Sequence, residues 1–429
     1  MKEPNSKLRQ IGLIGATALV IANMIGVGIF TTTGYLLADM PSRGWVLFAW
    51  FIGGVMALLG AVCYGALSQR LPESGGEYFF LSRTIHPSVG YISGWLSLFV
   101  GFSAPIAASA YGIGVYLRPW VFGVEPRWVG TFAVLMIALV HGAGVRRGLL
   151  MQNLMVGFKL LLLVLFLSWA GYNLEDSVPM PSWDFQYDTF SVSLVWIFFA
   201  YAGWNAVVYI AGEIKEPHRN LSKSMLIGTL AVILLYLVLN AVLLWGADPD
   251  SIKGKENVAS IVAESLGGTR MAGFISFLIV VSLTTSVSAM LMAGPRVYAK
   301  MAEDGYLPSF MKSPNPPGCS NMVFQLVVVL LMLWIPRFRD LITYIGFTLG
   351  IGTALTVVGL VRLKRKEGAS MHVPGWPVIP FLFLLMVLWV TVFSIRNNPF
   401  PSFLGLLTLL GGWVAWWIQE KAKERNNSS

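Results

Sequence analysis

Long hydrophobic segments with almost no charged residues alternate with short polar segments along the whole chain. The runs Ile11–Ala38, Trp45–Leu67, Leu149–Gly171 and Leu221–Gly246 show this pattern most clearly. Each exceeds the roughly 20 residues that an α-helix needs to cross about 30 Å of hydrocarbon. The pattern therefore predicts an all-α integral membrane protein rather than a soluble one.

We distinguish twelve such segments and predict twelve transmembrane helices in a single membrane domain, 1–429, because no linker divides the chain. The predicted spans lie at about 11–38, 44–70, 88–118, 128–145, 150–171, 190–213, 223–247, 270–301, 321–336, 339–362, 376–395 and 401–419.

The composition and the distribution of charge agree with this topology. Charged residues make up 12% of the chain, whereas a soluble domain carries about 25%. Most of the 30 Lys and Arg residues fall in the loops on the same side as the two termini. Because cationic loops stay in the cytoplasm, we predict a multi-pass protein of the cell membrane with both termini cytoplasmic. Topology also accounts for the net charge of +9, so we expect membrane lipid as a partner and no nucleic acid.

The residues that usually carry catalysis or bind metals form no recognisable group. Cys63 and Cys319 are not placed for a structural disulfide. The four histidines show no metal-ligand spacing. We therefore expect no metal, no cofactor and no enzymatic activity. The alternative of a membrane-embedded enzyme acting on lipid-linked substrates requires a polar catalytic cluster near the headgroups, and none is evident.

Two predicted spans are interrupted at comparable depths. The first contains Met24–Phe30 and the sixth contains Phe199–Asn205, about 175 residues or five spans apart. A single glycine motif is compatible with close helix packing, but matching interruptions in two halves point to a transporter site built from broken helices. An offset of five spans requires the two repeats to be inverted. We predict repeats at about 11–171 and 190–362, with the last two spans, 376–419, outside them.

Such breaks suit a free amino acid, whose two charges must both be met where there is little water. Amides freed at Gly26, Val27 and Gly28 open a half-helix whose positive end favours a carboxylate. Freed carbonyl groups can accept hydrogen bonds from the ammonium group, while Phe199 could close over the ligand and Asn205 could bond to the ligand or the backbone. A packing role for these two side chains remains open. The candidate binding residues are Ala22, Met24, Ile25, Gly26, Val27, Gly28, Phe199, Ala200, Ala202 and Asn205.

Lys159 lies in the middle of the fifth span, with no acidic residue near it in sequence. An ammonium group at a helix centre costs at least about 3 kcal/mol, which favours a role in coupling. It is either a group that binds a proton or a fixed cation in the place where other transporters bind sodium. No Asp or Glu lies deep in any predicted span, and this favours a neutral substrate.

Four motifs in order resemble the amino acid–polyamine–organocation (APC) superfamily, and most closely its L-type-like amino acid transporters. They are Ile25–Phe30, Leu71–Tyr78, the segment from Phe199 to Asn205 with Glu213–Asn220, and Ala293–Tyr298 through Asp304-Gly305. The resemblance covers spans 1 to 10. It implies the LeuT-type fold of two inverted five-span repeats with broken helices 1 and 6, two additional C-terminal helices, and alternating access.

The resemblance also implies roles for individual residues. Gly26, Val27 and Gly28 would bind the carboxylate, and Phe199 would be the gating aromatic residue. Lys159 would replace a sodium ion and bridge span 5 to spans 1 and 8, with Ser286 as its partner in span 8. The family often has Ser or Thr where this chain has Val27, so no hydroxyl group from span 1 assists the carboxylate. Eukaryotic relatives attach a heavy chain through a cysteine after span 3; the segment 120–128 has none, so we expect no disulfide-linked heavy chain.

These observations predict a sodium-independent secondary active transporter of small neutral L-amino acids, either proton-coupled or an exchanger. A sodium-coupled symporter and an amino acid receptor that does not transport remain as alternatives.

Overall fold

The computed structural model describes residues 10–40, 42–142, 145–174, 187–313, 318–334 and 338–427. Within these ranges the protein is helical, and the only β-type pairing is an isolated bridge between Ile11 and Ile214. The predicted all-α fold is therefore confirmed.

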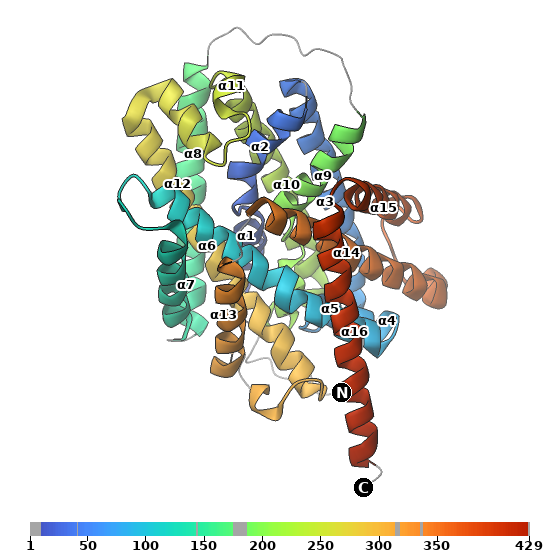
Figure 1. Ribbon diagram of the computed structural model, residues 1–429. Helices are drawn as coiled ribbons and strands as arrows, with labels where there is room; N and C mark the ends of the chain where they lie inside the picture. The colour runs from blue at the N-terminus through green and yellow to red at the C-terminus, as the bar shows by residue number, and fades with distance from the viewer. Residues whose placement is uncertain are drawn as a thin grey trace.

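The helices follow one another with short connections (Figure 1). In chain order the described elements are α1 (Leu13–Met24), α2 (Gly28–Asp39), α3 (Arg43–Arg70), α4 (Gly76–Thr84), α5 (Pro87–Leu96), the π-helical η1 (Ser97–Ser103), α6 (Ala104–Leu117), α7 (Pro126–Gly142), α8 (Val145–Asn173), α9 (Tyr187–Tyr201), the 3₁₀-helical η2 (Ala206–Glu213), α10 (Pro217–Trp245), α11 (Pro249–Ile252), α12 (Val258–Glu303), η3 (Ser309–Met311), α13 (Cys319–Leu333), α14 (Phe338–Glu367), η4 (Gly368–Ser370), α15 (Val378–Asn397) and α16 (Pro399–Asn427).

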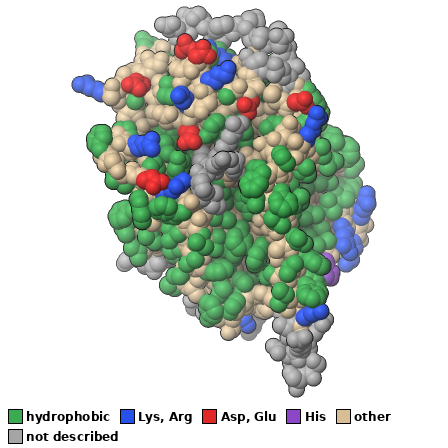
Figure 2. Space-filling model, viewed as in Figure 1, with side chains coloured by type: hydrophobic (Ala, Val, Ile, Leu, Met, Phe, Trp, Pro, Cys, Tyr) green, Lys and Arg blue, Asp and Glu red, His purple; other side chains and the backbone are tan. Residues whose placement is uncertain are grey.

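The surface and the helix lengths both suit a bilayer. Ten helical segments of the described chain are long and apolar enough to cross a membrane, and two shorter apolar helices, Pro126–His141 and Cys319–Leu333, occupy the fourth and ninth predicted spans. Figure 2 shows a broad area of hydrophobic side chains, with charged side chains mostly at the upper end and the right edge of the view. The count of twelve spans and the inverted repeat remain predictions.

The first and sixth spans are broken where the sequence predicts. The first helix ends at Met24 and α2 begins at Gly28, while α9 ends at Tyr201 and η2 begins at Ala206. Gly203, between α9 and η2, has a φ of +107°, a conformation that costs glycine little but strains other residues. A Cβ atom at Gly203 would also lie 2.8 Å from the backbone of Asn23, so the two breaks approach each other closely.

Three features of the backbone are not predicted by the hydrophobic pattern. The helix α4 forms between the second and third predicted spans, in a segment for which no helix is predicted. The third span contains the π-helical segment η1, a type of irregularity found often at functional sites. The helix α12 bends at Gly267 and Gly268, so its first part lies outside the predicted eighth span.

Packing brings the broken helices to the middle of the molecule. The helix α1 packs against α8, α10 and α12, while α2 packs against α9. The C-terminal helices α15 and α16 pack against α14, and α15 lies on the opposite side of the molecule from α7 (Figure 1). The breaks are therefore enclosed by α3, α8, α10 and α12 rather than exposed at the periphery.

Candidate functional site

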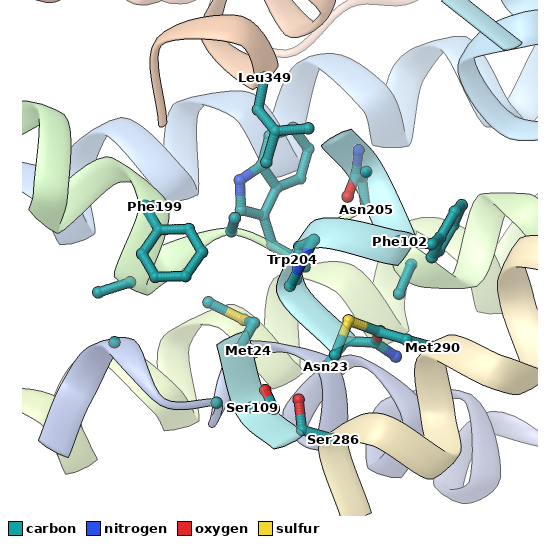
Figure 3. A pocket seen from close by; sticks show the side chains of 18 of the residues that line it. Asn23, Met24, Phe102, Ser109, Phe199, Trp204, Asn205, Ser286, Met290 and Leu349 are labelled. Atoms are coloured by element: carbon teal, nitrogen blue, oxygen red, sulfur yellow. The ribbon is translucent and has the colours of Figure 1, made fainter. Parts of the chain in front are cut away.

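A cavity of about 80 Å³ lies where the two breaks meet. Figure 3 shows Met24, Phe199 and Trp204 around this space, with the hydroxyl groups of Ser109 and Ser286 below them in the view. Of the predicted residues, Ala22, Ile25 and Lys159 do not line the cavity. Those that do are Met24, Gly26, Val27, Gly28, Phe199, Ala200, Ala202, Asn205 and Ser286.

The two breaks are in direct contact at Gly28. A Cβ atom built at Gly28 would lie 2.7 Å from the Cα of Ala200 and 3.3 Å from the ring of Phe199. Only a residue without a side chain allows this approach, since real Cβ atoms are not found so close to backbone atoms. Glycine in the first break is therefore required by packing as well as by access of a ligand to the backbone.

Tyr236 of α10 joins the carbonyl groups of both breaks. Its hydroxyl group is within hydrogen-bonding distance of the carbonyl oxygens of Met24 and, at 3.1 Å, Ala200. A hydroxyl group has one hydrogen, and each carbonyl oxygen has two lone pairs. The Met24 oxygen also accepts from the Gly26 N–H, so it can take a further donor only when the tyrosine hydrogen is directed to Ala200, whereas the Ala200 oxygen keeps capacity for a further donor in either case. Tyr236 is not among the residues predicted from the sequence, although a phenol in the middle of an apolar span is a visible signal.

The amide groups of the first break are partly engaged. The Gly26 N–H donates to the Met24 carbonyl oxygen at 2.9 Å, which closes a tight turn. The helix α2 begins at Gly28 after Val27, and no side chain caps it. The first N–H groups of a helix have no partner within the helix, so the start of α2 offers donors and a positive dipole end to the cavity.

Ser286 of α12 supplies a hydroxyl group at this place. Its Oγ lies 3.4 Å from the position that a Cβ on Gly26 would take. The hydroxyl group is buried and has no hydrogen-bond partner within the described part of the chain. A hydroxyl group from the eighth span thus lies beside the first break, where the sequence analysis noted that Val27 provides none.

Lys159 is completely buried in α8. Its Nζ donates to the Thr285 Oγ1 at 3.0 Å and lies 3.5 Å from the Ile25 carbonyl oxygen. The ammonium group therefore joins α8 to α12 and to the first break. No ion pair found among the described residues includes it.

The partner of Lys159 in α12 differs from the sequence-based expectation. We expected Ser286, but the donor–acceptor contact is with Thr285. Successive residues of a helix point about 100° apart, so the two hydroxyl groups cannot face the same neighbour. Thr285 faces α8, whereas Ser286 faces the cavity.

A chain of buried hydrogen bonds extends from Thr285 along α12. Gln152 Nε2 of α8 donates to the Thr285 carbonyl oxygen at 3.1 Å, and Ser288 Oγ donates to Gln152 Oε1 at 2.6 Å. His141 Nε2 of α7 lies 2.7 Å from Ser288 Oγ. Because the serine hydrogen is already directed to Gln152, His141 must be the donor in this last bond. Three helices are thereby fixed around the segment that contacts Lys159.

Glu77 is a buried carboxylate that the sequence analysis missed. It lies on α4, is 6% exposed, and lines the cavity. Its Oε1 accepts hydrogen bonds from the Tyr64 hydroxyl at 2.6 Å and from Asn205 Nδ2 at 2.9 Å. Burial raises the pKa of Glu77 to about 7, against the opposing effect of these two bonds. No acid lies deep in a predicted span, but the short helix α4 between two spans folds into the core and carries this one.

Several contacts join different segments at the end of the molecule where η2 ends at Glu213. The Arg296 side chain forms an ion pair with Glu213, including a bond of 3.0 Å from Nη2 to Oε2. The Gly212 N–H donates to Ser74 Oγ at 2.8 Å. The residues before α1 pair with the segment after η2 through the bridge at Ile11. Three of the four sequence motifs therefore meet at one end of the sixth span.

Metal ligands are not grouped in the described residues, which contain no cluster of three or more His, Cys, Asp or Glu side chains. Cys63 and Cys319 are both free.

Comparisons with known proteins agree with the geometry of the site. Residues 11–414 match the family described as "Amino acid permease". The chain is 26% identical over 430 residues to "Large neutral amino acids transporter small subunit 2" of Mus musculus, covering 96% of this chain and 81% of the relative. It is 26% identical over 438 residues to "Serine/threonine exchanger SteT" of Bacillus subtilis (strain 168), covering 98% and 99%. It is 25% identical over 428 residues to "Asc-type amino acid transporter 1" of Mus musculus, covering 94% and 80%.

These matches confirm the resemblance to L-type-like transporters of the APC superfamily. The relatives named are transporters, so the expectation that the chain is not an enzyme is confirmed as well.

Proposed function

Because the chain belongs to the amino acid permease family, we propose that it carries small neutral L-amino acids across the cell membrane by alternating access, without sodium. The observation that carries this proposal is the cavity between the two helix breaks. It places the start of α2 and the hydroxyl group of Ser286 near the carbonyl groups of Met24 and Ala200.

The two ends of a zwitterion would find different partners in this cavity. The carboxylate would bind at the start of α2, where N–H groups and the helix dipole favour negative charge. The ammonium group would donate to the carbonyl oxygens of the breaks at Met24 and Ala200. Phe199 would cover the ligand, since its ring already lies beside Gly28. The small cavity supports a small side chain.

Independence from sodium is supported by the position of Lys159. Its ammonium group touches the Ile25 carbonyl and the Thr285 hydroxyl, oxygen ligands of the kind that bind a hard cation. A positive charge there opposes a metal ion by charge repulsion. We also propose that both termini are cytoplasmic, because most Lys and Arg residues fall in the loops on their side. A disulfide-linked heavy chain is not proposed, because the connection 118–125 between α6 and α7 contains no cysteine.

The proposal is tested by counterflow in proteoliposomes loaded with neutral amino acids, at equal pH and without sodium. Labelled alanine, serine, leucine and lysine are offered outside, one at a time. We expect accumulation of at least one neutral label and none of lysine. Uptake that requires sodium would instead establish the sodium-coupled symporter, and amino acid binding without flux would establish a receptor.

Ser286→Ala is expected to weaken substrate binding without destabilising the protein. The hydroxyl group has no partner in the described structure, so its removal leaves no protein group unpaired. A hydrogen bond to a charged ligand contributes about 1.5–3 kcal/mol, which corresponds to roughly 10- to 150-fold in affinity. Isothermal titration of the purified variant measures this change. An unchanged affinity would remove Ser286 from the site.

A further inference from the structure

We propose that the Glu77 carboxylate binds the proton that enters with the amino acid, and that its protonation releases the broken sixth span for opening to the cytoplasm. This inference rests on the proposed function, and it assigns the coupling proton to a residue other than Lys159.

Glu77 is joined to the moving part of the proposed mechanism. Asn205, which donates to its carboxylate at 2.9 Å, is the last residue of the break before η2. Tyr64, which donates to the same oxygen at 2.6 Å, belongs to α3. One carboxylate oxygen therefore links the second span, the helix α4 and the break in the sixth span. A change in its charge acts directly on this junction.

Within the described ranges, no charged group compensates Glu77. The elements around it contribute Tyr64 from α3, Tyr209 from η2, Ser93 from α5 and Gly352 from α14. Arg296 of α12 is paired with Glu213 instead. Among the described residues, no Lys or Arg forms an ion pair with Glu77. A buried carboxylate without a cation is ionised only at considerable cost, so proton binding near neutral pH follows from its surroundings.

The surroundings favour a proton over a cationic side chain of the substrate. The Oε1 atom is already occupied by two donors of the protein itself. The adjacent wall of the cavity consists of Trp204, Tyr209 and Phe102, which provide apolar surface. A proton needs no additional volume and can bind to the second oxygen, Oε2, whereas an ammonium or guanidinium group would need space beside Oε2, where Gly352 packs so closely that a Cβ atom on it would lie 3.2 Å away.

The two protonation states hold the junction with different strength. The ionised carboxylate accepts charge-assisted bonds from Asn205 and Tyr64, and such bonds are about twice as strong as neutral ones. The neutral acid accepts them more weakly. Proton binding therefore loosens η2 from α3 and α4 while the amino acid is bound. The proton arrives from the outer solution and leaves to the cytoplasm after opening, so each cycle moves one proton inward and restores the carboxylate.

Glu77→Gln separates proton coupling from substrate transport. Glutamine keeps an oxygen that can accept from Asn205 and Tyr64, but it cannot bind and release a proton. Purified protein in liposomes is assayed twice with a labelled neutral amino acid: counterflow at equal pH, and uptake driven by an acidic outer solution with a pH-sensitive dye inside. An outer pH one unit lower supports about tenfold accumulation at one proton per amino acid.

We expect the wild type to accumulate label and acidify the lumen, whereas Glu77→Gln keeps counterflow and loses both gradient-driven signals. Glu77→Asp should retain gradient-driven uptake. Glu256→Gln is the matched control. Glu256 also accepts a hydrogen bond from a tyrosine hydroxyl group, that of Tyr35 at 2.9 Å, but it does not line the cavity. This variant should behave as the wild type.

Four results would overturn the proposal, and the proposed function is judged separately by counterflow of the wild type. The first is wild-type counterflow without proton-driven uptake, which establishes an exchanger. The second is full gradient-driven uptake by Glu77→Gln. The third is wild-type transport of lysine that Glu77→Gln abolishes, which would assign the carboxylate to a cationic substrate. Thermal unfolding of Glu77→Gln verifies that lost signals do not arise from misfolding; loss of counterflow in a stable variant also counts against the proposal.

Discussion

Lys159→Ala is expected to reduce transport to less than about one tenth of the wild-type rate. The substitution removes the donor that joins the Thr285 hydroxyl and the Ile25 carbonyl across two helices. Hydrogen bonds from charged groups contribute about 1.5–3 kcal/mol each, so the loss of even one corresponds to about tenfold or more. Counterflow of a neutral amino acid at equal pH measures the effect.

The neighbouring residue provides a control in the same helix turn. Phe158 is 44% exposed on the outer face of α8, so Phe158→Ala should transport normally. Lys159→Met keeps the length of the side chain without its charge, and it should fail as Lys159→Ala does. The variants are also assayed with sodium, because an emptied cation position could then bind the ion. Normal sodium-free transport by both Lys159 variants would show that the charge has no part in the cycle.

The sequence predicts the backbone of the site better than its side-chain partners. Glycine residues in the sequence indicate both breaks, because Gly28 and Gly203 occupy positions that other residues fill only with strain. Likewise, no acidic residue lies near Lys159 in sequence, and the structure shows a buried ammonium group with no ion pair among the described residues. Such signals lie in the local sequence and do not depend on how the helices pack.

The sequence does not predict which side chains from distant segments contact each other. The choice of Ser286 over Thr285 as the partner of Lys159 depends on the rotation of α12 about its axis, which a segment rich in serine and threonine does not fix. Glu77 was missed because it lies between two hydrophobic runs, where an acidic residue normally faces water. Only the packing of α4 against η2 and α14 places its carboxylate at the cavity.

Gly28→Ala is expected to lower the thermal stability and to abolish transport, although it adds only one methyl group. The new Cβ would lie 2.7 Å from the Ala200 Cα and 2.8 Å from its Cβ, so the backbone of one break must move. Overpacking of this kind costs about 1–3 kcal/mol, which exceeds the roughly 0.5–1 kcal/mol that alanine gains over glycine in a helix. Thermal unfolding in detergent and counterflow together measure both effects.

Two further glycine variants show whether the contact between the breaks, rather than glycine itself, is what matters. Gly157 of α8 has nothing within 4 Å of its Cβ position, so Gly157→Ala should be at least as stable as the wild type and transport normally.

At Gly26 the nearest atom to a built Cβ is Ser286 Oγ at 3.4 Å, an ordinary contact. Gly26→Ala should therefore fold normally but lose stabilisation by added amino acid, because its methyl group occupies the place proposed for the carboxylate. If Gly28→Ala unfolded at the wild-type temperature and transported normally, the close approach of the two breaks would not be required for function. If Gly26→Ala were still stabilised by substrate, the carboxylate would have to bind elsewhere in the cavity.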